Sequence, residues 1–256
     1  MTKTICAGIL AAMMLFAGLF ALMGLSARPG YGDLVGALKE YDSYRPAGGE
    51  CLTIQDGLPP GTAIQIPAII TAALSSDEMP GGPLGGTVTE SFGRIMMMDL
   101  QGGGALGGFH RAVNMNIQGF VVNSAPHNLN DPLQSFDTDL FALQGQLPPG
   151  DPDFDLLRIT AGTGFGLPSP GHTTLTQLPG DNWAIDSFFD ITYRIDFVGA
   201  PGGPLGGMSG STTGTIRLEA FNPNEIPEPA SLALVGAGLA GLGGYVRRRR
   251  RTGLRT

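Results

Sequence analysis

Charged residues are scarce in this chain: they make up 14% of its 256 residues, and basic residues are scarcer than acidic ones. Residues 28–226 contain eight basic and 21 acidic residues, a net charge of −13. Because the phosphates of nucleic acids would repel such a surface, the composition argues against a nucleic-acid partner. An acidic body is compatible with an extracellular protein and with divalent cations as ligands.

Cysteine, histidine and aromatic residues are also few. Removal of an N-terminal segment that contains Cys6 would leave one cysteine, so the exported form would not depend on an intrachain disulfide. The three histidines, His110, His127 and His172, lack the paired spacing of a metal site, and we expect surface positions for them. Aromatic residues make up 7% of the chain, fewer than a polysaccharide hydrolase usually shows.

Motifs of common catalytic sites are missing too. The sequence has no Gly-x-Ser-x-Gly elbow, no His-Glu-x-x-His and no phosphate loop. Residues 102–107 match the dinucleotide-binding glycine spacing, but no helical pattern follows them. A hydrolytic triad could be drawn from His172 among Ser169, Thr173 and Asp181, but any secreted β-protein offers such a group of residues. We therefore expect no catalytic residues, and a body that is not an enzyme.

The body of the chain shows no catalytic motif but does show the two-residue period of β-strands. Apolar residues alternate with polar ones over residues 189–197, 113–118 and 216–220, the pattern of half-buried strands. The 41 glycines and 20 prolines fit turn-rich β-structure. A short helix is expected only over residues 34–41.

One seven-residue stretch occurs twice. Pro-Gly-Gly-Pro-Leu-Gly-Gly occupies residues 80–86 and 201–207, an offset of 121 that also aligns Ile64 with Ile185 and Ile95 with Ile216. The spacing predicts an all-β body over residues 51–221: an antiparallel β-sandwich built from two related halves. We expect the repeated loops to be structural connectors at equivalent positions.

Three alternate carboxylates form the best candidate for a metal site. Asp151, Asp153 and Asp155 are hard oxygen ligands of the kind that calcium prefers. Leu156 and Leu157 stand where a calcium loop would need glycine, however, so an acidic turn before a strand is the competing interpretation. No other cofactor is expected.

The N-terminus reads as a secretory signal. Residues 5–25 are apolar or glycine throughout, and Gly24 and Ser26 suit cleavage after residue 26 by signal peptidase. The alternative is an uncleaved anchor, since the run is long enough to span the membrane. Residues 27–50 are then a linker, and residues 222–225 are a second linker.

The C-terminal tail, residues 226–251, has three parts. Residues 231–246 form a run of 16 residues without charge, roughly 24 Å as a helix, and predict a transmembrane segment. Basic residues follow it and should stay cytoplasmic, namely Arg247, Arg248, Arg249, Arg250 and Arg251. Before the run stands a short motif of Pro227, Glu228, Pro229, Ala230 and Ser231.

The order and spacing of these three parts resemble the PEP-CTERM sorting signal of Gram-negative bacteria. The resemblance covers only this tail. It implies passage through the inner membrane, recognition by an exosortase, cleavage near Pro227-Glu228-Pro229, and delivery to the cell surface or the exopolysaccharide matrix. In such a signal the motif is a substrate rather than an active site.

We therefore expect an exported surface or matrix protein with a structural or adhesive body. A carbohydrate-binding module or a secreted polysaccharide hydrolase is the alternative, the latter requiring a pair of carboxylates across a cleft.

Overall fold

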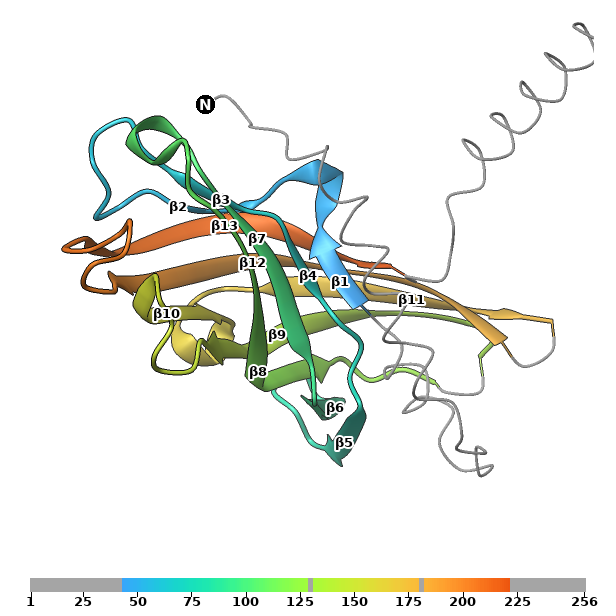
Figure 1. Cartoon of the computed structure of the whole chain (residues 1–256). Helices are drawn as coiled ribbons and strands as arrows, with labels where there is room; N and C mark the ends of the chain where they lie inside the picture. The colour runs from blue at the N-terminus through green and yellow to red at the C-terminus, as the bar shows by residue number, and fades with distance from the viewer. Residues whose placement is uncertain (1–42, 129–130, 180–181, 222–256) are drawn as a thin grey trace, which may run out of the picture. The chain divides into compact units, whose positions relative to one another are not determined.

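The computed structural model describes residues 43–128, 131–179 and 182–221 (Figure 1). All of them belong to the first of two compact units, Met1–Asn222 and Pro223–Thr256. The signal segment, the expected helix over residues 34–41 and the sorting tail lie outside the described residues. Within the described ranges, no helix has the length and apolar character needed to cross a membrane. The two flanking membrane helices stay predictions.

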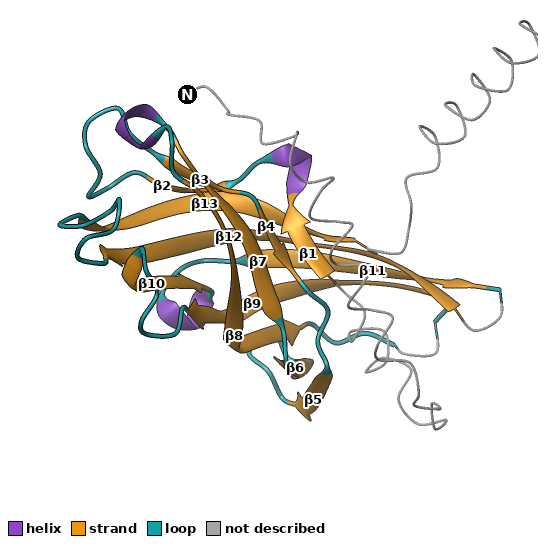
Figure 2. Ribbon diagram, viewed as in Figure 1, coloured by secondary structure: helices purple, strands orange, loops and turns teal. Residues whose placement is uncertain are grey.

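The all-β class is confirmed for the described part of the chain (Figure 2). Three short 3-10 helices, η1 (Ala47–Gly49), η2 (Gly104–Leu106) and η3 (Thr163–Phe165), interrupt the strands. The strands are β1 (Ser43–Pro46), β2 (Leu52–Ile54), β3 (Ile64–Ile66), β4 (Ala68–Ile70), β5 (Ser75–Pro80), β6 (Thr87–Phe92), β7 (Ile95–Gly102), β8 (His110–Ser124), β9 (Leu133–Gln146), β10 (Phe154–Ala161), β11 (Pro170–Leu178), β12 (Asn182–Gly199) and β13 (Ser209–Phe221).

The sheet closes on itself. β1 pairs with both β4 and β13, and β7 pairs with both β4 and β8. Following the pairings from β7 through β8, β9, β10, β12, β13, β1 and β4 therefore returns to β7. β11 lies between β9 and β12 along part of their length, and the pairs β2–β3 and β5–β6 extend the sheet at other places.

This closure corrects the expected sandwich. A sandwich has two separate sheets that face each other across the core, whereas in the described part of the chain one sheet of 13 strands surrounds the core. Alternation could not distinguish the two arrangements, because both bury every second residue of a strand. The construction of the body from two related halves stays a prediction.

The alternating pattern itself is confirmed in β12. Its apolar positions from Phe189 to Phe197 are at most 5% exposed, while Asp190 lies on the outer face. Buried residues from all around the sheet join in a single cluster, and each large side chain in it contributes about 1.5–3 kcal/mol relative to an exposed one. The rings that are no more than 2% exposed are Phe120, Phe154, Phe189 and Phe197.

Tyr193, one of the alternating apolar positions of residues 189–197, belongs to this core. Its side chain is 5% exposed, and its hydroxyl accepts the backbone N–H of Thr53 at 3.1 Å. Burial raises the pKa of Tyr193 despite that hydrogen bond. The absence of a side chain at Gly214 leaves space for the Tyr193 ring, since a Cβ at Gly214 would lie 2.6 Å from the Tyr193 hydroxyl oxygen.

Both copies of the repeated loop connect consecutive antiparallel strands. The first joins β5 to β6, with Pro80 opposite Thr87, and the second joins β12 to β13, with Val198 opposite Ser209. β3 and β4 pair with β7 in nearly the same register as the first hairpin, so that hairpin continues, with breaks, over residues 64–102. Each copy is thus a hairpin connector.

The two loops differ in what their leucines contact. Leu84 is 38% exposed, whereas Leu205 is fully buried in the core. The second loop folds back tightly on β12: a Cβ at Gly199 would lie 1.9 Å from the carbonyl oxygen of Leu205. The two copies of the same seven-residue sequence therefore lie in different environments.

Replacing each leucine tests this difference. Leu205→Ala should lower the free energy of unfolding by about 2–5 kcal/mol, because it opens a cavity in the core. Leu84→Ala is the matched control and should change it by less than about 0.5 kcal/mol. Urea unfolding followed by circular dichroism measures both, and equal losses would contradict the burial of Leu205.

Candidate functional site

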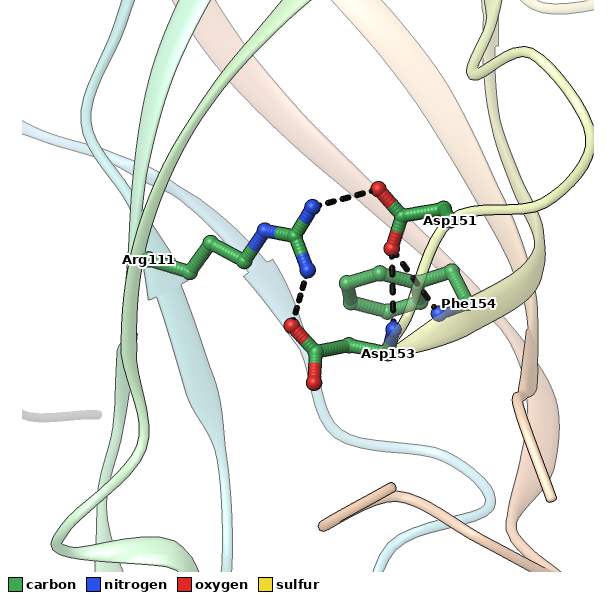
Figure 3. Close-up of polar contacts among 4 residues, drawn as sticks. All are labelled: Arg111, Asp151, Asp153 and Phe154. Atoms are coloured by element: carbon green, nitrogen blue, oxygen red, sulfur yellow. Dashed lines mark hydrogen bonds and ion pairs between the residues drawn. The ribbon is translucent and has the colours of Figure 1, made fainter. Parts of the chain in front are cut away.

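Two of the predicted calcium ligands face an arginine. The guanidinium of Arg111, from β8, lies between Asp151 and Asp153, with Nη2 at 2.6 Å from Asp151 Oδ2 and Nη1 in contact with Asp153 Oδ2 (Figure 3). The Asp151 and Asp153 side chains are 11% and 17% exposed. The Coulomb attraction within an ion pair that is so shielded from solvent is stronger than within a surface pair.

The rest of the turn is organised by Asp151. Its Oδ1 accepts the backbone N–H groups of Asp153 at 3.0 Å and Phe154 at 3.1 Å. The ring of Phe154 is 1% exposed, so the turn is anchored in the core where β10 begins. Asp155 is exposed on β10, away from this arrangement. The local structure is that of an acidic turn leading into a strand.

These contacts bear on the calcium hypothesis. A cation bound by Asp151 and Asp153 would have to displace Arg111, which already supplies the positive charge. Among the described residues, no group of three His, Cys, Asp or Glu side chains is placed to hold a metal ion. Calcium binding at Asp151, Asp153 and Asp155 stays a prediction, and the geometry favours the arginine.

A groove of about 500 Å³ opens beside this turn. It is lined by the η2–β8 connection, by Asp153, and by Pro204 of the second repeated loop. Phe109 lies in it with its ring edge-on to Phe154 at 6.3 Å, and His110 Nε2 lies 2.8 Å from Asp99 Oδ1. The groove thus combines an aromatic ring with hydrogen-bonding side chains, a lining that suits a neutral polar ligand.

A second, smaller cavity of about 50 Å³ lies inside the sheet. Arg94, 3% exposed, lines it; its Nη1 donates to the carbonyl oxygen of Thr71 at 2.9 Å, and its guanidinium carbon lies 4.3 Å from the ring centroid of Phe120. The buried hydroxyl of Thr138 also lines it, without a hydrogen bond among the described residues. Since one water needs about 10–15 Å³, the cavity fits a few water molecules and no sugar.

Arginines on the outer face pair with carboxylates of neighbouring strands. Arg217 donates to Asp190 at 2.6 Å, and this hydrogen bond lowers the pKa of the Asp190 carboxyl. Because these positive charges are neutralised locally, the excess carboxylates leave the surface acidic. Further ion pairs between neighbouring strands are Arg45 with Glu219 and Arg158 with Asp196, and Arg194 pairs with Asp196 within β12.

The residues of the sorting motif, 227–231, and the basic cluster, 247–251, lie outside the described residues. The family model of the PEP-CTERM protein-sorting motif matches residues 225–251, which confirms the resemblance of the tail. No curated protein and no solved structure matches the chain.

Removing Arg111 tests the role of the acidic turn. Arg111→Ala should lower the free energy of unfolding by about 2 kcal/mol, because two poorly solvated carboxylates lose their partner. Arg217→Ala removes an ion pair whose side chains are each 48% exposed, so it should cost about 1 kcal/mol or less. Urea unfolding compares the two variants.

The same samples, melted with calcium and then with a chelator, test the metal hypothesis. If Arg111 occupies the site, calcium leaves the midpoint of the parent chain unchanged. A rise in that midpoint would show that the ion enters despite the arginine.

Proposed function

We propose that this chain is exported across the inner membrane and processed there by an exosortase, and that its body serves at the cell surface or in the exopolysaccharide matrix. The observation that carries the proposal is the match of residues 225–251 to the PEP-CTERM sorting motif. Signal peptidase, acting after residue 26, is the second processing enzyme in this scheme.

The physical character of the tail supports this route. The arginine run would stay in the cytoplasm, and the apolar run of residues 231–246 would halt export in the membrane. Pro227 and Pro229 restrict the backbone and favour an extended segment. An extended segment just outside the membrane is accessible to a protease-like cleft. Cleavage there releases an acidic body from the basic tail.

The filled interior of the body supports the proposal of a structural or adhesive role. Among the described residues, one core cluster fills the interior of the closed sheet, and a cavity of about 50 Å³ there is large enough for a few water molecules but too small for a sugar. Contacts with matrix components are therefore made by the outer surface, which is acidic. Such a surface suits cationic or cation-bridged neighbours.

Carbohydrate binding is the second candidate, and the groove favours it. Its volume of about 500 Å³ falls in the range of small-molecule sites, and Phe109 offers an aromatic face. Hydrolysis of a polysaccharide would need two carboxylates across the cleft. The carboxylate that lines the groove is Asp153, and Arg111 holds it. Binding without hydrolysis fits this arrangement better.

The sorting proposal predicts the fate of a proline variant. With Pro227→Ala and Pro229→Ala together, the extended segment is lost, and uncut protein should accumulate in the inner membrane. Intact-mass measurement of the membrane and surface fractions shows whether Arg247 to Arg251 are still present.

Pro223→Ala supplies the control, because this proline lies outside the matched motif. It should be processed like the parent chain. A surface form of the parent that retains all five arginines would contradict processing and leave a plain membrane anchor as the better account.

The groove proposal predicts an effect of Phe109→Leu on binding to the purified exopolysaccharide. Loss of the aromatic face should weaken binding roughly tenfold. Phe165→Leu changes a ring that is 44% exposed on η3, outside the groove lining, and should leave affinity unchanged. Equal affinities for all three proteins would exclude the groove, and release of new reducing ends would favour the hydrolase.

A further inference from the structure

The outer face of β9 and β11 brings together a serine, a histidine and an aspartate. His172 on β11 stands directly opposite Asp137 on β9, and Ser135 is the next residue on the same face of β9. Directly opposite side chains lie about 5 Å apart at Cβ, and a diagonal neighbour is still within reach of a histidine ring. The strand register therefore sets this group in place.

Two hydrogen bonds connect the three side chains in the order Ser135, His172, Asp137. His172 Nδ1 lies 2.9 Å from Asp137 Oδ1, and His172 Nε2 lies 2.8 Å from Ser135 Oγ. A carboxylate only accepts hydrogen bonds, so the ring proton of neutral His172 belongs on Nδ1. Nε2 is then the acceptor for the hydroxyl proton of Ser135. This is the connectivity of a hydrolytic triad.

The trio suggested by sequence position is a different one. Ser169 is fully buried, and its hydroxyl donates to the carbonyl oxygen of Leu167 at 3.0 Å, while Asp181 lies outside the described residues. Ser135 and Asp137 lie 37 and 35 residues from His172 and are joined to it by strand pairing alone.

We propose that Ser135 is an activated nucleophile that accepts acyl groups from small carboxylic esters, with His172 as its base and Asp137 as the residue that positions His172. Thr174 is the fourth member of the site, because its Oγ1 lies 3.4 Å from Ser135 Oγ. This activity goes beyond the proposed sorting and matrix role, and it would replace the expectation that the body has no catalytic residue.

The chemistry balances with water as the only co-reactant. Ser135 Oγ bonds to the ester carbonyl carbon while its proton passes to His172 Nε2, and the Thr174 hydroxyl donates to the developing oxyanion. His172 then protonates the leaving oxygen, the C–O bond breaks and an alcohol departs. Water attacks the acyl-serine in the same way, releasing a carboxylic acid and restoring Ser135.

The open position of the site selects the kind of substrate. The side chain of Asp137 is 81% exposed and that of His172 is 37% exposed, so the site takes an ester from bulk solvent or from a neighbouring chain. Leu133, 61% exposed, precedes Ser135 on the same face, and Phe188 stands opposite His172 on β12. These residues favour a short apolar acyl group. With one hydroxyl as oxyanion donor, we expect slow turnover.

The full-length chain treated with a fluorophosphonate tests the proposal. Ser135 Oγ should bond to phosphorus as fluoride leaves, which intact-mass measurement and peptide mapping detect at Ser135. Ser211, an exposed strand serine beside Asp196, is the internal control and should stay unmodified. Hydrolysis of p-nitrophenyl acetate, lost in Ser135→Ala, measures turnover.

Variants of His172 and Asp137 test whether these residues activate Ser135 or whether Ser135 is labelled only because it is exposed. His172→Gln should slow labelling about 100-fold or more. Asp137→Asn should slow it at least about tenfold, and Asp137→Glu, which keeps a carboxylate, should restore part of the rate. Circular dichroism melting checks that each variant is folded. Absent labelling, or a rate at Ser135 that is unchanged by His172→Gln in a folded protein, would overturn the proposal. Neither result depends on whether the tail is cut.

Discussion

The pairing of β1 with two strands at once is the constraint on which the rest of the body depends. β1 is four residues long, yet it joins β13 on one side and β4 on the other. Without it, both neighbours would present unpaired backbone groups at open edges. Tyr44, in its middle, packs against Phe120 and Phe189 with ring centroids 5.9 and 5.5 Å apart. Closure and core packing are therefore coupled at this strand.

Because the sheet is closed and its interior is filled, side chains that can contact partners lie on its outer surface and in its loops. Inward positions are occupied by one apolar cluster, so side chains that meet partners lie on the outward half of each strand or at its ends. The groove beside Arg111 is built from connections, whereas the Ser135, Asp137 and His172 group lies on a strand face. The sorting motif of residues 225–251, in contrast, is defined by the order and spacing of its residues along the chain.

Several features were predictable because they depend on neighbours in the chain. Alternation over residues 189–197 identified β12 and the buried position of Tyr193. The repeated loop indicated two hairpin connectors. Closure of the sheet was not predicted, because the alternation within one strand does not depend on which strand lies next to it. The Asp151 turn was recognised as acidic, but its partner Arg111, 40 residues away, could not be identified from spacing.

The sequence by itself determined the all-β class, the two hairpin connectors and the sorting tail, because periodicity, glycine and proline chemistry and a linear motif are local properties. Tertiary structure alone decided that Leu84 is exposed and Leu205 buried within the same seven residues. It also decided that His172 meets Ser135 and Asp137 rather than its neighbours in sequence. The physical reason is strand register: a pairing between distant segments sets which side chains face each other, and a shift of one residue would reverse every face.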